Sequence, residues 1–381
     1  MDKRWADVAS KRNTNGVERD LDALADRLRR ALAEFQPDLA GAPLEPLADT
    51  GLAHDHIRLA GRGLLARIPK QSQMGLAASD NLRYQAACFE RASASGHMPG
   101  LHAVLPPSAD LARGALIVEE IVGRAARLPD DLPAIATALA AMHLLPLPAP
   151  VARPPLRDAA DPLLDLINEI SAQAAFLPRA ALAPASLAAI TAELAGLVAS
   201  GRRGSRPPKT LISFDAHPGN FIVTPTGKAV LVDLEKARYG YPPLDLAHAT
   251  LYTSTTWDVA TYAELTPAQV GDFYGTWSAV MGARAGDWQD WLVDLRRGMW
   301  LWSVTWCAKW RVLSDGQSQA AADGEDWSAS KSEAALIEHV RGRVECYLSP
   351  AIVHQVQDEL ATLDRLLTAS GRFSDQTTGP R

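Results

Sequence analysis

The sequence predicts an α+β protein with two lobes, a small lobe built on antiparallel strands and a larger lobe that is mainly helical. Two observations carry this prediction. Short apolar runs separated by turn signals occupy residues 46–70, a pattern typical of strands in a meander. Helical periodicity covers most of residues 162–200, 258–313 and 332–369, with a small hairpin pattern inserted before the last two segments.

The small lobe is expected to begin with a helix. In residues 17–36 apolar side chains recur at steps of three and four, which predicts an amphipathic helix. Turn signals at residues 49–51 and 61–63 then divide residues 46–70 into three short strands that we expect to pair in antiparallel order.

A further helix and a buried strand complete the small lobe. Residues 79–95 open with serine and aspartate as cap candidates and predict the helix. The apolar residues 114–123 predict a strand that runs into a loop. We therefore assign residues 1–120 to the first lobe with its leading helix, residues 121–370 to the helical lobe, and residues 371–381 to a disordered tail.

The second lobe is expected to start with a helix over residues 132–148, which prolines stop. The proline-rich residues 145–157 predict a connection, and a helical pattern resumes over residues 162–200. Residues 210–234 then predict a strand followed by a hairpin of two strands around a Gly-Lys turn.

Composition limits the possible functions. The 381 residues carry a net charge of −6 with acids and bases mixed throughout, whereas non-specific nucleic-acid binding needs a basic face. The three cysteines form neither a zinc pattern nor a disulfide framework. No apolar run reaches the roughly 18 residues of a membrane helix, and the start of the chain does not resemble a secretion signal. We expect a cytoplasmic protein without nucleic-acid or membrane partners, and the sequence leaves its oligomeric state open.

Polar residues gather at the mouth of the hairpin, in the stretch SFDAHPGN, residues 213–220. Asp215 precedes Asn220 by five residues, and Asn220 precedes Asp233 by thirteen. Because one tight hairpin separates them, we expect Asn220 and Asp233 to lie close together. Carboxylate and amide oxygens suit a hard cation such as Mg²⁺. Each residue alone is more typical of a turn, but the set indicates a site.

The same order of an aspartate, an asparagine and a second aspartate after a hairpin occurs in kinase catalytic loops. The stretch FDAHPGNFIV…GKAVLVDLEKARYGYPPLDLAH resembles the aminoglycoside phosphotransferase and choline kinase family of small-molecule kinases. That family carries H-G-D-x-H-x-x-N, then I-D-W/F-E, then P-x-x-D-L-A. The resemblance is strong over residues 211–249 and weaker over residues 43–143. It implies a protein-kinase-like two-lobed fold with a nucleotide between the lobes.

Carried over to this sequence, the resemblance implies that Asp215 is the catalytic base, which accepts the proton of the acceptor hydroxyl. Asn220 and Asp233 would hold Mg²⁺ on the nucleotide phosphates. Supporting roles fall to three further residues, His217, Glu235 and Asp245. Ser213 and Phe214 stand where the family has His-Gly, which leaves the geometry of the loop open.

The phosphate contacts are expected in the first lobe. Gly51 is the single glycine in the phosphate-covering loop. Arg67 is the expected basic residue of the third strand, where kinases place a lysine, and Lys70 just past the strand is the alternative. An arginine can contact a phosphate through two N–H groups. The acid that pairs with this basic residue stays open, because the family spacing points to Gln85, which carries no charge.

The resemblance implies an ATP- and Mg²⁺-dependent kinase for a hydroxyl group of a small molecule, and nothing in the sequence excludes GTP. The backbone of Glu119 and Ile121, at the hinge between the lobes, is expected to bind adenine. The alternative is a catalytically inactive protein of the same fold that binds a nucleotide or a metabolite. A protein kinase is disfavoured because PPLD follows Asp233 within twelve residues, which leaves no room for a long activation loop.

A stripe of tryptophans suggests the kind of acceptor. Trp302, Trp306 and Trp310 recur at steps of four and share one side of a predicted helix. Indole faces bind organic cations, and Asp290 and Asp294 on the preceding turns could add negative charge. We therefore predict a cationic acceptor, such as an amino alcohol or an aminoglycoside-like compound, near Trp302, Trp306 and Asp290. The alternative is that these tryptophans only pack the core.

Overall fold

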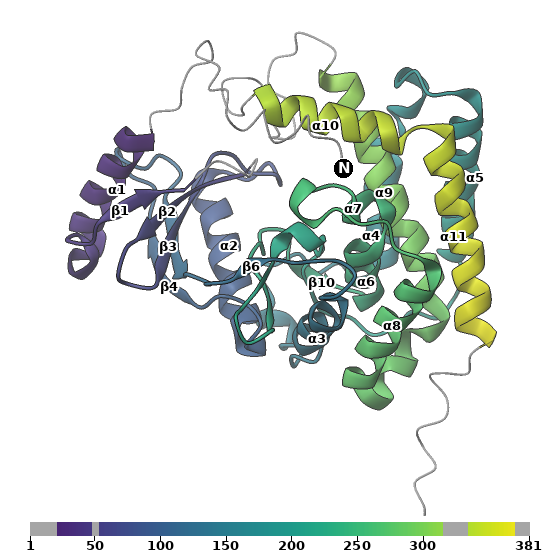
Figure 1. The fold of residues 1–381 in the computed structure, drawn as a ribbon, viewed down its shortest axis with the longest axis horizontal. Helices are drawn as coiled ribbons and strands as arrows, with labels where there is room; N and C mark the ends of the chain where they lie inside the picture. The colour runs from purple at the N-terminus through teal and green to yellow at the C-terminus, as the bar shows by residue number, and fades with distance from the viewer. Residues whose placement is uncertain (1–20, 48–52, 315–333, 370–381) are drawn as a thin grey trace, which may run out of the picture.

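The computed structural model describes residues 21–47, 53–314 and 334–369, which form two lobes side by side (Figure 1). The first lobe holds a five-stranded sheet, and the second is mostly helical. Gly51, which the sequence assigns to the phosphate-covering loop, lies outside the described residues. None of the described helices combines the length and the apolar character needed to cross a membrane.

The sheet of the first lobe is antiparallel throughout, in the order β1-β2-β3-β5-β4. Its strands are β1 (Leu44–Pro46), β2 (His54–Leu59), β3 (Leu64–Pro69), β4 (Leu101–Leu105) and β5 (Ala115–Glu119). In the β2–β3 turn, Gly61 and Gly63 have φ angles of 74° and 63°, a left-handed conformation that glycine adopts without a steric penalty. The sequence pattern predicts β2, β3 and β5, overlaps β1 only at Pro46, and misses β4.

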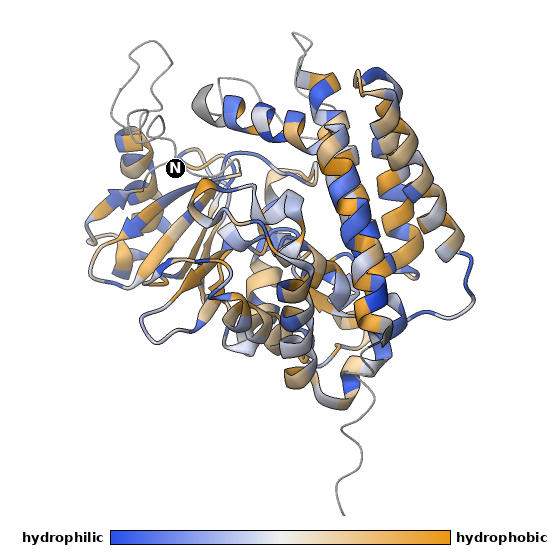
Figure 2. Ribbon diagram, turned by 45° about the vertical axis from the view of Figure 1, so that its right-hand side comes forward, coloured by the Kyte–Doolittle hydropathy of each residue, from blue (hydrophilic) through white to orange (hydrophobic). Residues whose placement is uncertain are grey.

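Two helices pack on this sheet, α1 (Leu21–Phe35) and α2 (Ala78–Ala92). Along β5, Ala115 and Ile117 join the core beneath α1, whereas Leu116 and Val118 join the core beneath α2. Side chains of a strand alternate between its two faces, so the two helices cover opposite faces of the sheet. Hydrophobic residues are frequent along these strands (orange in Figure 2).

Side chains of α2 also bind the second lobe. The hydroxyl of Tyr84 donates to the carbonyl oxygen of Ala237 over 2.7 Å. The guanidinium of Arg91 donates to the carbonyl oxygens of residues 152–154. Helix α2 is therefore fastened to both lobes.

The described part of the second lobe contains nine α-helices. They are α3 (Leu132–His143), α4 (Pro162–Ala174), α5 (Pro184–Ser200), α6 (Pro242–Thr250), α7 (Tyr252–Thr255), α8 (Pro267–Met281), α9 (Leu292–Ser314), α10 (Ala334–Tyr347) and α11 (Pro350–Ala369). Helix α9 is central, and α4, α5, α6 and α10 all pack against it. Its residues Leu295, Met299 and Val304 are fully buried.

Short 3₁₀ turns connect many of these elements. They are Pro37–Leu39, Ser93–Ser95, Pro150–Ala152, Leu177–Arg179, Pro218–Asn220, Val259–Thr261 and Gly282–Trp291. The last of them separates α8 from α9, so the helical segment predicted over residues 258–313 is not continuous. The predicted helical stretch 162–200 is likewise two helices, because Pro184 starts a new one.

The described residues of the second lobe also form five short strands: β6 (Arg124–Ala125), β7 (Thr210–Ile212), β8 (Phe221–Val223), β9 (Ala229–Leu231) and β10 (Arg238–Gly240). Strands β8 and β9 form the predicted hairpin, and the N–H of Val232 donates to the carbonyl of Asn220 over 2.9 Å. This register places Asn220 and Asp233 together at the mouth of the hairpin.

The chain passes between the lobes in the segment that joins β5 to β6, because β6 pairs with β8 of the second lobe. The proline-rich residues 145–157 connect α3 to α4 within the helical lobe. Strands β6 and β10 are not predicted from the sequence; they are only two and three residues long, too short for a periodic pattern.

Candidate active site

One carboxylate, that of Asp245 in the first turn of α6, holds the loop after β7. Its oxygens accept the backbone N–H groups of Ser213 and Phe214, each over 2.8 Å. Its Oδ1 also accepts the hydroxyl of Ser213 over 3.2 Å, and Ser213 Oγ accepts the N–H of Asp215 over 3.1 Å. These bonds hold the loop against the first turn of α6, and the supporting role of Asp245 in catalysis stays a prediction.

A buried histidine completes this brace. Trp277 Nε1 donates to Nδ1 of His143 over 3.0 Å. The other ring nitrogen, Nε2, therefore carries the proton and donates to Oδ2 of Asp245 over 3.1 Å. This contact is not predicted from the sequence, because His143 lies in a helix rich in alanine and leucine, where the pattern indicates packing alone.

Phe214 adopts a conformation that favours glycine. Its φ is 57°, which costs a residue other than glycine about 1–2 kcal/mol. The two loop N–H bonds to Asp245 hold this backbone. The guanidinium of Arg238 lies 3.7 Å from the Phe214 ring centroid, and the ring of Trp302 meets it edge-on at 5.5 Å. The loop therefore has a left-handed residue directly before Asp215.

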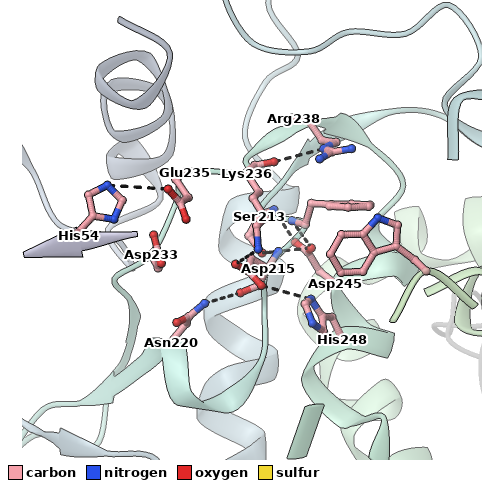
Figure 3. Close-up of polar contacts among 12 residues, drawn as sticks. His54, Ser213, Asp215, Asn220, Asp233, Glu235, Lys236, Arg238, Asp245 and His248 are labelled. Atoms are coloured by element: carbon pink, nitrogen blue, oxygen red, sulfur yellow. Dashed lines mark hydrogen bonds and ion pairs between the residues drawn. The ribbon is translucent and has the colours of Figure 1, made fainter. Parts of the chain in front are cut away.

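Asp215 lies at the centre of the residues drawn in Figure 3. Its Oδ2 accepts a hydrogen bond from Nζ of Lys236 over 2.8 Å, and its Oδ1 lies 3.9 Å from Nδ1 of His248. Burial favours the neutral carboxyl, but the opposing effects of Lys236, His217 and His248 add up and hold the pKa of Asp215 below its usual range. Asp215 is therefore ionised at neutral pH. Sequence analysis assigned no role to Lys236 or His248.

Asn220 is oriented by the same loop. Its Nδ2 donates to the backbone carbonyl of Asp215 over 2.8 Å. This bond directs the amide nitrogen toward the loop and leaves Oδ1 as the atom available to a cation.

His217 and Gly219 lie between these two residues. The ring centroid of His217 is 6.0 Å from that of His248. A Cβ on Gly219 would lie 2.8 Å from Oδ2 of Asp258 and 2.9 Å from the His217 ring. Glycine therefore allows the carboxylate of Asp258 to approach the loop closely.

Asp233 meets an arginine from the other lobe. Nη2 of Arg67, on β3, donates to Oδ1 of Asp233 over 2.8 Å, and Nη1 donates to the carbonyl of Val232 over 2.9 Å. The ring of Phe89 lies 5.5 Å from the same guanidinium. Burial opposes ionisation, but Arg67 and, to a smaller extent, His54 and Lys236 together hold the pKa of Asp233 well below its usual range.

Three other residues are predicted to bind the nucleotide: Lys70, Glu119 and Ile121. The buried ammonium of Lys70 lies 3.7 Å from Asp55. Glu119 ends β5 and accepts the N–H of Gly100 over 3.1 Å. Ile121 lies in the segment that joins the lobes. The structure therefore brings Arg67 to Asp233, and directs Lys70 to a different carboxylate.

Gln85 on α2, where the family spacing places an acid, makes neutral contacts. Its Oε1 is 3.0 Å from Nε2 of His54, and its Nε2 donates to Oε2 of Glu235 over 3.4 Å. The carboxylate that pairs with Arg67 is that of Asp233. The sequence left the acidic partner of Arg67 open. In the structure this partner is Asp233, the residue that is also predicted to bind the metal.

His54, Asp233 and Glu235 each offer an atom within 4.8 Å of the others, so we tested them as a metal site. Burial and the charge of Asp233 raise the pKa of Glu235 to about 8, which keeps most of this group protonated at neutral pH. Both ring nitrogens of His54 already face partners, Gln85 and Arg67. The oxygens of Asn220 and Asp233 are better suited to a hard cation.

The phosphotransferase enzyme family matches residues 56–282 of the sequence, more than half of the chain. The chain belongs to this family. No curated protein matches the sequence. The match includes the braced loop, the hairpin and the residues that pair with Asp215 and Asp233.

Solved structures of kinases resemble this phosphotransferase in fold. A choline/ethanolamine kinase family protein from Mesorhizobium loti has a TM-score of 0.53 at 19% identity, over 89% of this chain and 99% of its own. An ethanolamine kinase from Plasmodium vivax has a TM-score of 0.57 at 12% identity, over 94% and 97%. The GDP complex of aminoglycoside 2′-phosphotransferase-IIIa has a TM-score of 0.51 at 14% identity, over 89% and 99%.

The protein-kinase-like two-lobed α+β fold predicted from the sequence is thereby confirmed, as is the family.

Trp302 lies beside the partners of Asp215. Its ring meets that of His248 at 6.4 Å, and the ammonium of Lys236 lies 5.9 Å from its centroid. Its Nε1 donates to Oε1 of Glu169 over 2.7 Å. The cation nearest this indole is therefore one that the protein itself supplies.

The other residues of the predicted acceptor stripe differ from one another. Trp306 is half-buried, with its ring centroid 5.9 Å from that of Trp257, whereas Trp310 is buried. Asp290 is exposed in the 3₁₀ turn before α9, and twelve residues separate it from Trp302, roughly 18 Å along a helix. The structure does not bring Asp290 to the tryptophans near Asp215.

Proposed function

We propose that the protein transfers a phosphoryl group from ATP, in the presence of Mg²⁺, to a hydroxyl group of a small molecule. The observation that carries this proposal is the placement of Asp215, Asn220 and Asp233 around one loop and hairpin. Asp215 is paired with Lys236 and Asp233 with Arg67. The two carboxylates are thus held ionised side by side, as phosphoryl transfer requires.

Asp215 would orient the acceptor hydroxyl and take its proton. The hydroxyl oxygen bonds to phosphorus, the bond from phosphorus to the nucleotide breaks, and the hydroxyl proton moves to Asp215. Because Lys236 lowers the pKa of Asp215, this carboxylate is a weak base and accepts the proton late. A loose transition state needs positioning more than early proton removal.

Asn220 and Asp233 would hold the metal. Asn220 offers Oδ1, since Nδ2 is bonded to the loop, and Asp233 keeps its Oδ2, since Arg67 bonds to Oδ1. Two hard oxygen donors fit Mg²⁺, which keeps several positions for water and phosphate. When bound, the ion would supply positive charge to the phosphates.

The first lobe would hold the nucleotide. The planar guanidinium of Arg67 is suited to bind a phosphate through two N–H groups, and its ion pair with Asp233 directs it to that place. The backbone of Glu119 and Ile121 would bind adenine at the lobe junction, and Gly51 would belong to the phosphate-covering loop.

The acceptor would carry a positive charge. Lys236 already lies at the face of Trp302, so we assign the cation to the neighbouring indoles of Trp306 and Trp257. Asp258, next to Trp257 in the chain, brings a carboxylate to the catalytic loop and supplies the opposite charge. Relatives described as choline and ethanolamine kinases share this fold, which supports an amino alcohol.

The test is a panel of choline, ethanolamine, an aminoglycoside, glycerol and glucose, screened for ADP release with Mg²⁺-ATP. We expect ADP release with at least one cationic compound, quenching of tryptophan fluorescence by that compound, and loss of turnover in Asp215→Asn. Turnover of glycerol or glucose alone, without any response to the cationic compounds, would overturn the charge of the acceptor. Nucleotide binding without turnover of any compound would favour the inactive, ligand-binding alternative.

A further inference from the structure

His248 stands out as a buried polar side chain with an unpaired nitrogen. It lies on α6, three residues after Asp245, and is 7% exposed. Its Nδ1 makes no hydrogen bond to any described residue. A buried donor or acceptor without a partner is costly, and native proteins rarely leave one unless water or a ligand completes it.

The unpaired nitrogen faces the carboxylate of Asp215. Nδ1 of His248 lies 3.9 Å from Oδ1 of Asp215 (Figure 3), too far for a direct hydrogen bond. A single oxygen atom at about 2.8 Å from both would fit, because hydrogen bonds to oxygen have that length. The other carboxylate oxygen, Oδ2, is bonded to Lys236. Oδ1 is therefore the atom of Asp215 that remains for the acceptor.

A second observation points to the same place. Nδ1 of His217 is also buried without a hydrogen bond among the described residues, and the two imidazole rings lie 6.0 Å apart. Two imidazole rings near the carboxylate of Asp215 thus each have a nitrogen without a hydrogen bond among the described residues. This indicates that a small polar ligand binds between them.

Resting on the proposed function, we propose that His248 binds the acceptor hydroxyl, with Nδ1–H donating to the oxygen while the hydroxyl proton points to Oδ1 of Asp215. The hydroxyl oxygen has two lone pairs. One accepts the hydrogen bond from His248, and the other is left to attack phosphorus. The pair of His248 and Asp215 therefore selects a hydroxyl group, because an ammonium group has no lone pair that could accept a hydrogen bond from Nδ1–H of His248.

A neutral imidazole suits this role. Burial lowers the pKa of His248 to about 4 despite the nearby carboxylate of Asp215, so the ring carries one proton at neutral pH. It binds the oxygen without neutralising Asp215. The imidazole packs against the ring of Trp302, with 6.4 Å between the two ring centroids.

The experiment compares three substitutions of His248 with the compound of the panel that turns over fastest. His248→Asn keeps an amide nitrogen near the place of Nδ1, His248→Gln moves the amide toward the place of Nε2, and His248→Leu has no polar atom. We expect His248→Leu to lose roughly 3- to 10-fold in kcat/KM for that compound, the worth of one neutral hydrogen bond. His248→Asn should recover most of the loss, and His248→Gln should not.

Two further measurements separate binding from packing. The KM for ATP and the thermal midpoint should be similar in His248→Asn and His248→Gln, since both replace the ring with an amide. His97→Leu is the matched control, because it removes a half-buried imidazole that bonds to the carbonyl of Ala229, and it should leave kcat/KM for the acceptor unchanged.

The outcomes distinguish the two proposals. If wild type turns over a compound but the Asn and Gln variants lose the same activity, His248 only fills space and the inference is wrong. The same holds if the loss appears in the KM for ATP. If wild type turns over no compound of the panel, the proposed function fails, and the role of His248 fails with it.

Discussion

The site contains two carboxylates, each paired with a cation at the same distance but built in different ways. Asp233 and Arg67 are 2.8 Å apart and come from different lobes. Asp215 and Lys236 are also 2.8 Å apart, but both lie in the helical lobe. The metal and nucleotide half of the site therefore depends on the position of the two lobes, whereas the acceptor half is complete within one of them.

The largest expected effect is at Asp215. Asp215→Asn should lower kcat by at least ~100-fold, the scale of general acid–base help, while nucleotide affinity stays near that of wild type. The reason is that Asp215 is expected to contact the acceptor and not the nucleotide. Steady-state ADP release and calorimetric titration with nucleotide measure the two quantities. A variant with turnover close to wild type would sink the assignment.

Asp233→Asn tests the other half. It removes a charged oxygen ligand, so we expect a loss of rate together with a shift of the Mg²⁺ titration to higher concentration. Asp215→Asn is the control, because it should lose rate without that shift. Superimposable Mg²⁺ titrations of wild type and Asp233→Asn would mean that Asp233 does not hold the metal.

Lys236→Met should change the pH dependence. In wild type the pKa of Asp215 is depressed, so its ionised form is present above that pKa and is lost as the pH falls through it. Without the ammonium, burial dominates and the pKa rises. The acid limb of the profile of kcat/KM against pH should move to higher pH. An unmoved acid limb would show that Lys236 does not control the ionisation of Asp215.

Arg67→Ala should act mainly on the nucleotide, raising the KM for ATP because a phosphate contact is lost. Lys70→Ala is the matched comparison, since this lysine lies nearby but pairs with Asp55. It should raise the KM for ATP less. If the ranking is reversed, the phosphate contact belongs to Lys70.

The smallest effect on turnover is expected for Phe214→Gly. Glycine relieves the left-handed backbone, worth about 1–3 kcal/mol, but the buried ring is lost, which typically costs about 3–5 kcal/mol. We therefore expect a fall of roughly 2 kcal/mol in the free energy of unfolding with little change in kcat. Denaturant unfolding measures it, and a variant more stable than wild type would mean that the ring does not offset the strain.

Local patterns explain how much of this site the sequence could predict. Asp215, Asn220 and Asp233 lie within one loop and hairpin, so their spacing determines their proximity. The pairing of Arg67 with Asp233 joins residues 166 positions apart, and no spacing in the sequence predicts it.

His248 and Lys236 were missed for a related reason. Each is a single polar residue in a short element, and its direction depends on how α6 and the segment before β10 pack. The tryptophan stripe was predicted as one surface, but α9 is surrounded by other helices. Trp310 is therefore buried, while Trp302 and Trp306 remain half-buried.

Helix α2 has a consequence for control of the enzyme. In protein kinases the position of the corresponding helix is an on–off switch, which activation-loop phosphorylation sets. Here the hydroxyl of Tyr84 and the guanidinium of Arg91 tie this helix to backbone oxygens of the helical lobe. Outward movement of α2 would leave those carbonyl oxygens and the guanidinium of Arg91 without their hydrogen bonds. Any movement of α2 away from the helical lobe would therefore have to break these hydrogen bonds first.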